Sequence, residues 1–300
     1  MINMSPDVAT DVSAAAESAP STRRRFWRRL RSERKVLIGL VIVAILAFIA
    51  IFGPLLAPYD PEADDYELFA APSLDHLFGT DSFGRDILSR MMAGTRISFT
   101  VGISVAVLSM VVGVTLGLIA GYFGGWLDSL IMRFMDLLWA FPEIILAVGM
   151  VAVFGAGIRN IIIAIAVAYL DDFARVVRAE VLRLREEEYA LAAKAIGASH
   201  RRIMLMHILP NTLAPVIVQA TFAVGLGILA ESGLTFLGLG VSPSTPTWGL
   251  TLNEGRDFIR QAWWISVFPG LAIMVTVLGL NLLGDGLRDT LDVRGVKETV

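Results

Sequence analysis

Long apolar runs alternate with short polar segments along this chain, and this alternation predicts its architecture. An uncharged run of about 20 residues is long enough for an α-helix to cross the ~30 Å hydrocarbon core of a bilayer. The fourth run is the weakest, because charged residues fall inside it, among them Asp171, Asp172, Arg175 and Arg178. The pattern predicts an all-α polytopic membrane protein with six spans, at residues 36–56, 97–122, 137–154, 160–181, 212–236 and 263–283.

The segments between these runs suggest how the chain is divided. Residues 1–35 form a polar tail, expected to be disordered up to residue 22 and to become a basic interfacial anchor with eight Lys and Arg at residues 23–35. The expected parts that follow are a first transmembrane helix, an extracytoplasmic loop, a five-helix core and a cytoplasmic tail, at residues 36–57, 58–96, 97–287 and 288–300.

The distribution of positive charge predicts the orientation. Of the 25 Lys and Arg, 19 fall in the N-terminal tail and in every second segment after it. Because cytoplasmic segments of membrane proteins carry an excess of Lys and Arg, both termini are expected in the cytoplasm. The segment at 60–86 carries eight acidic residues, as an outside loop can.

One polar island, residues 186–211, separates the fourth run from the fifth. Its first half has helical periodicity, which places four apolar or small side chains on one face: Tyr189, Ala192, Ala193 and Ile196. Gly197 is expected to end that helix. Ser199 can cap a second helix at 200–209, which Pro210 is expected to limit. Small alanines on an exposed face would let a partner's backbone approach closely.

This island resembles the cytoplasmic signature of the permease subunits of bacterial ATP-binding-cassette importers. The matching residues are Leu191, Ala192 and Ala193, then Gly197, then the run from His207 to Pro210. Leu191 and His207 depart from the family pattern, which has Glu and Ile there. The resemblance implies docking to ATPase subunits, and the alternative is an ordinary amphipathic connector.

A second motif lies in the expected extracytoplasmic loop, at residues 76–90. It resembles a signature of the second permease of dipeptide and oligopeptide importers, as do residues 231–249, 268–270 and 281–289. Two glycines permit turns, and Asp81 or Ser82 can bind loop amides. The alternative is a structural capping loop without solute contact. The motif residues are Gly79, Thr80, Asp81, Gly84, Arg85 and Asp86.

Ionisable residues inside apolar runs are costly and normally face a bundle interior or a water path. Glu143 is interpreted as a carboxylate at the start of a helix. Asp171 and Asp172 can pair at helical spacing with Arg175 or Arg178. Glu231 is a candidate pore-lining residue that could meet the ammonium group of a peptide. A helix-end hydrogen bond is the alternative for Glu231.

The amino-acid composition argues against several classes of protein. Hydrophobic residues make up 55% of the chain and the mean hydropathy is +0.68, values too apolar for a soluble domain. The chain has no Cys and three His that are not spaced for a metal, and its charge of -3 implies no nucleic-acid partner. No catalytic constellation and no GxxxxGK[ST] motif occurs, so the chain itself is not expected to be an enzyme or to hydrolyse ATP. An intramembrane hydrolase and a channel are the competing classes.

The resemblance implies that this chain is one subunit of a larger transporter. A second homologous permease, two ATPase subunits and an extracytoplasmic solute-binding protein are expected as partners, together with the lipid bilayer of the bacterial inner membrane. No cofactor is expected in this chain, since ATP and Mg²⁺ would bind the ATPases. The implied cargo is di- or oligopeptides, although close relatives take nickel complexes, glutathione and opine- or sugar-like solutes.

Overall fold

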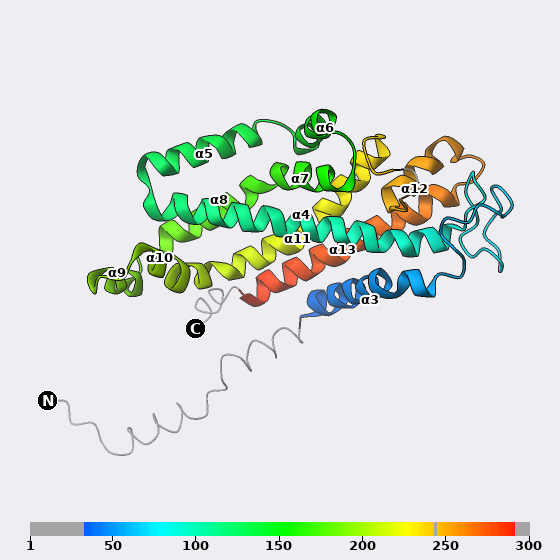
Figure 1. The fold of residues 1–300 in the computed structure, drawn as a ribbon. Helices are drawn as coiled ribbons and strands as arrows, with labels where there is room; N and C mark the ends of the chain where they lie inside the picture. The colour runs from blue at the N-terminus through cyan, green and yellow to red at the C-terminus, as the bar shows by residue number, and fades with distance from the viewer. Residues whose placement is uncertain (1–32, 243–244, 292–300) are drawn as a thin grey trace, which may run out of the picture.

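The protein is a bundle of helices, seen in a computed structural model that describes residues 33–242 and 245–291 (Figure 1). Within these residues, extended pairing is confined to one isolated bridge, between Thr80 and Asp86. The expected all-α class is therefore confirmed. The predicted disordered tail, most of the basic segment and the residues after 291 lie outside the described ranges.

Four long helices run side by side and form the body of the bundle (Figure 1). They are α3 (Arg34–Leu56), α4 (Ile87–Phe123), α11 (Leu209–Phe236) and α13 (Trp264–Leu291). The other helices are α5 (Gly125–Trp139), α6 (Glu143–Phe154), α7 (Ile158–Ala168), α8 (Leu170–Leu184), α9 (Glu188–Ala195), α10 (His200–Arg202) and α12 (Trp248–Gly255). A π-helical turn follows α10 at Ile203–Ile208, and a 3₁₀ turn follows α12 at Arg256–Phe258.

The described residues contain four helices long and apolar enough to cross a membrane. Helices α5 and α6 would make a fifth span if counted together, although they are bent by 90° at the break between them. The predicted fourth span corresponds to α7 and α8, which are separated at Tyr169 and carry its charged residues. The count of six spans therefore stays a prediction.

The helix ends differ from the expected segment boundaries at three places. Helix α4 begins at Ile87, so the preceding loop ends at residue 86 instead of 96. The third run is helical from Gly125 onward, but it is broken after Trp139. Helix α13 continues past residue 287 to Leu291. Charged residues suggested loops at these places, but several of them pair with other helices and the backbone stays helical through them. Arg90 pairs with Glu254, Asp136 with Arg175 and Asp289 with Lys35.

Glycines allow α4 to approach its neighbouring helices closely. A Cβ atom at Gly102 would collide with Val224 and Ile228 of α11. One at Gly113 or Gly117 would collide with α8, between Leu170 and Val177. The missing side chains thus place α4 directly against two other helices.

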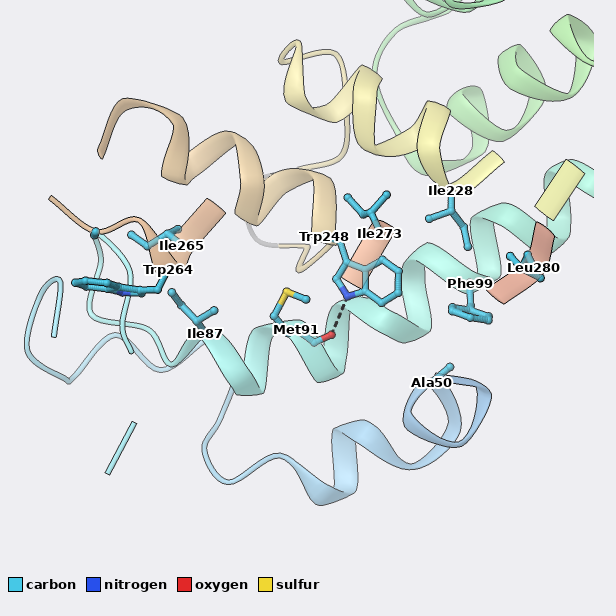
Figure 2. Close-up of a cluster of buried hydrophobic side chains, with 11 residues drawn as sticks. Ala50, Ile87, Met91, Phe99, Ile228, Trp248, Trp264, Ile265, Ile273 and Leu280 are labelled. Carbon is cyan, nitrogen blue, oxygen red and sulfur yellow. Dashed lines mark hydrogen bonds between the residues drawn. The ribbon is translucent and has the colours of Figure 1, made fainter. Parts of the chain in front are cut away.

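An aromatic and aliphatic core closes the end of the bundle that carries residues 57–86 and α12 (Figure 2). Trp248 of α12 donates its indole N–H to the carbonyl of Met91 at 3.2 Å and meets Phe99 edge to face. Trp264 of α13 donates to the carbonyl of Thr80 at 3.0 Å. These bonds anchor the loop and α12 to α4 and α13.

Candidate functional site

The polar island folds as the predicted helix, bend and second helix at one end of the bundle (Figure 1). Gly197 follows α9 with φ +79°, a left-handed conformation that glycine adopts without strain. The side chain of Ser199 then caps α10 by accepting from the amide of Arg202 at 3.4 Å. Both local predictions are confirmed.

The exposed face of α9 differs from the predicted one at Ala193. Tyr189, Ala192 and Ile196 are exposed, and Ile196 keeps 85% of its accessible surface. Ala193 is 7% exposed and packs in the same cluster as Ile203 and Ile208, so it supports the fold from within. We call Tyr189, Ala192 and Ile196 the docking strip.

Tyr189 gives the docking strip a neutral polar group. Partial burial, with a smaller contribution from Glu187, raises the pKa of Tyr189 above its ordinary value. The phenol is therefore protonated at physiological pH and can both donate and accept a hydrogen bond.

The second helix does not end at Pro210, which corrects another prediction. Pro210 lies in the first turn of α11, directly after the π-helical turn Ile203–Ile208. There Leu209 donates to the carbonyl of Met204, five residues back, and the wider turn leaves room for the proline ring. The Asn211 side chain donates to the carbonyl of His207 at 2.7 Å. The island therefore continues into the membrane as one helical rod, His200–Phe236.

The opposite end of the bundle holds an ion cluster made of Asp81, Arg85, Arg90 and Glu254. Arg85 bonds to Asp81 at 2.7 Å and to Glu254 at 2.8 Å. Arg90, whose side chain is 1% exposed, lies 3.7 Å from Asp81 and 3.4 Å from Glu254. The cluster ties the loop and α4 to α12, and it borders a cavity of about 520 Å³.

Most of the motif at residues 76–90 is structural. Gly79 and Gly84 have φ of +76° and +77°, which confirms the predicted turns. Asp81 accepts from the amides of Phe83 and Arg85, also as predicted. Thr80, Asp81 and Asp86 are fully buried. Within the motif, Arg85 lines the cavity.

Two further partners in this region were missed from the sequence. Asp86 caps α4 by accepting from Ser89, and its second oxygen lies 2.9 Å from His76. Arg90 and Glu254 were not recognised as a pair, because 164 residues separate them. A basic residue just inside a span start was the available signal for Arg90.

Glu231 is not exposed to any pore in the described structure, contrary to its candidate role. It is fully buried, and its carboxylate accepts from Thr235 at 3.0 Å and from Ser232 at 3.4 Å. Gly249 of α12 lies directly against Ser232, so this face of α11 is covered by α12. The helix-end hydrogen bond, the alternative reading, is what the structure shows.

Carboxylates gather instead around the break between α5 and α6. Glu143 is the first residue of α6 and is exposed, in agreement with its reading as a helix-start carboxylate. It borders two cavities of about 380 and 410 Å³, and buried Tyr169 lines the second of them together with Glu143. Asp171 lines the first cavity.

Ion pairs attach α8 to α5 beside this break. Arg175 bonds to Asp171 at 3.4 Å, as predicted from helical spacing, and to Asp136 at 2.8 Å. Arg178 pairs with Asp128 at 2.6 Å instead of with the two aspartates of its own helix. The acidic partners on α5 were missed, because helical spacing reveals contacts only within one helix.

Comparison with known families decides the class of the protein. A family model described as "Binding-protein-dependent transport system inner membrane component" matches residues 113–295. The chain belongs to this family. A second model, described as the N-terminal TM domain of oligopeptide transport permease C, matches residues 21–72. The chain is thus a multi-pass inner-membrane permease subunit, and the resemblance drawn from its sequence motifs is confirmed.

Individual relatives are similar over nearly the whole permease. A dipeptide transport system permease protein from Alkalihalophilus pseudofirmus is 45% identical over 96% of this chain and 95% of the relative. A di/tripeptide transport system permease protein from Pseudomonas aeruginosa is 42% identical over 91% and 92%. A glutathione transport system permease protein from Escherichia coli is 48% identical over 89% of both chains.

Proposed function

We propose that this permease forms half of the pore of an ATP-driven importer for di- or oligopeptides. The peptide-transport names of its relatives support this cargo, and the family description supports delivery by a binding protein. A second homologous permease supplies the other half of the pore. Two ATPase subunits bind the ATP and Mg²⁺, and this chain contributes no cofactor site and no catalytic residue.

The observation that carries this proposal is the docking strip at the end of a helical rod. Exposed apolar residues on a polar, cytoplasm-facing helix need a partner to cover them, and the docking strip places three of them on one face. The buried contacts of Ala193 hold α9 against the π-helical turn, which leads into α11 without a break. Movement of an ATPase against the strip can therefore reach the membrane through one rigid element.

The solute path is proposed to pass the break between α5 and α6. Asp171 lines the cavity at this break, and its neighbours along α8, Leu170 and Phe173, pack on Gly113 of α4. Gly113 lies ten residues before the end of α4, roughly 15 Å inside the span at 1.5 Å per residue. Irregular backbone at such depth is tolerated only inside protein or along a water-filled cavity. The exposed Glu143 and the two cavities favour the water path.

We predict that Glu143→Gln raises the KM for peptide uptake about fivefold, with a smaller change in kcat. The carboxylate would meet the ammonium group of a peptide in a partly hydrated path, where such a contact is worth about 1 kcal/mol. Uptake of labelled dipeptide into reconstituted vesicles measures this. Asp285→Asn, an exposed carboxylate on α13, is the matched control and should leave KM unchanged. Equal KM values for the wild type, Glu143→Gln and Asp285→Asn would show that Glu143 does not line the solute path.

The proposed orientation places both termini and the docking strip in the cytoplasm. Reporter fusions at Asp65, Arg159 and Glu254 should report the outside, and fusions at Ser129, Lys194 and Lys297 the cytoplasm. This expectation follows from the excess of Lys and Arg in the segments that contain Ser129, Lys194 and Lys297 and in the N-terminal tail. A cytoplasmic signal from Asp65 or an outside signal from Lys194 would contradict this orientation.

Reconstitution of the permease with its partner subunits tests the function directly. We expect ATP-dependent accumulation of a dipeptide when the binding protein is present, and none when the ATPases are omitted. Competition by glutathione, nickel complexes and opine- or sugar-like solutes separates the alternative cargoes. ATP-independent flux of small ions through the same vesicles would favour the channel alternative.

A further inference from the structure

A basic cavity lies beside α9, on a side that the docking strip does not use. It has a volume of about 390 Å³ and is formed where the ends of α4 and α8 meet α9 and α10. Arg185, Lys194 and His200 line it, together with the rings of Tyr122 and Phe123 and the side chain of Glu186. We call these six residues the basic pocket.

The positive groups of the basic pocket exceed the negative ones. Arg185 is held in place by bonds to the carbonyl of Gly121 at 2.8 Å and to Glu186 at 3.1 Å. Lys194 is exposed and forms no hydrogen bond or ion pair with the described residues. The one carboxylate of the pocket is thus already paired, while the lysine lacks a counter-ion.

The remaining polar contact orders the wall of the pocket. The hydroxyl of Tyr122 lies 2.9 Å from Nδ1 of His200, and the imidazole meets the rings of Tyr122 and Phe123 edge to face. The Nε2 atom of His200 is not used by this bond. The wall therefore presents aromatic rings next to nitrogen atoms.

The depth of the pocket indicates what kind of anion it meets. Phe123 ends the span α4, and Trp126 follows it in the first turn of α5. Both are exposed, Phe123 at 50% and Trp126 at 76%. Exposed aromatic rings at the end of a span lie at the level of lipid headgroups. A basic pocket between helices at that level is a typical site for an acidic headgroup.

We propose that the basic pocket binds the phosphate of an anionic phospholipid in the adjoining leaflet. Lys194 and Arg185 would contact the phosphate oxygens, and Phe123 would cover the glycerol and the first part of the acyl chains. Ala190, Leu191 and Lys194 face the pocket, whereas the docking strip faces away from it. A bound lipid would thus stabilise α9 against α4 from the membrane side without blocking the docking strip.

The test uses the assembled transporter in nanodiscs of phosphatidylcholine that contain increasing fractions of phosphatidylglycerol. Native mass spectrometry after detergent release counts the phosphatidylglycerol retained by each complex. We expect Lys194→Gln to weaken retention about fivefold, the effect of one basic residue near an anionic surface. Lys194→Gln with His200→Gln should weaken it further. Arg183→Gln is the matched control, because Arg183 is paired with Glu180 and Glu187 outside the pocket.

Three results would overturn the proposal. Equal retention by the wild type, the Lys194 variants and the Arg183 control would show that the pocket holds no lipid. Loss of the ATPase subunits from Lys194→Gln at unchanged lipid retention would make the pocket a protein contact. If millimolar inorganic phosphate displaced phosphatidylglycerol from the wild type but not from the Lys194 variants, the pocket would be assigned to a free anion.

Discussion

Ala192→Glu is expected to release the ATPase subunits from a permease that folds normally, whereas Ala193→Glu is expected to destabilise the permease itself. Ala192 belongs to the exposed docking strip, where a charge in a desolvated contact should cost on the order of 2 to 5 kcal/mol of binding. Ala193 is 7% exposed on the inner face of α9, and burying an unpaired carboxylate there should cost on the order of 3 to 5 kcal/mol of folding.

Two measurements separate these outcomes: co-purification of the ATPases and thermal unfolding of the isolated permease. Ala192→Ser and Ala193→Ser are the matched controls, since serine adds little volume and no charge. Ala192→Glu should lower co-purification at an unchanged Tm, and Ala193→Glu should lower both. Loss of the ATPases at equal and unchanged Tm for both glutamate variants would contradict the inward position of Ala193. Full retention of the ATPase subunits by Ala192→Glu would show that the docking strip does not bind them.

Arg90→Met is expected to destabilise the end of the permease that residues 58–86 and α12 form by about 3 kcal/mol. Removing one member of a buried ion cluster typically costs about 3 to 5 kcal/mol, because the remaining charges lose their compensation. The cost should lie at the lower end, since Arg85 still contacts Asp81 and Glu254. Proteolysis within residues 58–86 and the Tm of the permease measure the effect.

Arg96→Met provides the matched control for Arg90. Arg96 lies on the same helix, is exposed and forms no ion pair with the described residues. Its replacement should change stability by no more than about 0.5 kcal/mol. Equal proteolysis of the two variants would show that the ion cluster does not hold the loop on α12.

The predictable part of the fold depends on short-range properties of the chain. The apolar runs located α3, α4, α11 and α13, since a helix that meets lipid must be apolar along its length. Turn chemistry was equally local. Gly79, Gly84 and Gly197 have the left-handed conformation expected of them, and Ser199 caps the helix that follows it.

Residue identity alone did not decide which polar groups would be buried. Arg90 suggested a loop, but Glu254 approaches it from 164 residues away and allows α4 to begin at Ile87. Glu231 suggested a pore, but α12 folds over it and Thr235 donates to it. Pairing energies depend on distance in space, which local spacing does not report.

By itself, then, the sequence determined the all-α membrane class, the main spans, the local turns and the motifs by which the permease family is recognised. The tertiary structure decided that Ala193 faces inward, because α9 must cover Ile203 and Ile208. It also decided that Pro210 continues a helix, because a π-helical turn makes room for its ring. These outcomes depend on contacts between segments that meet only after the chain has folded.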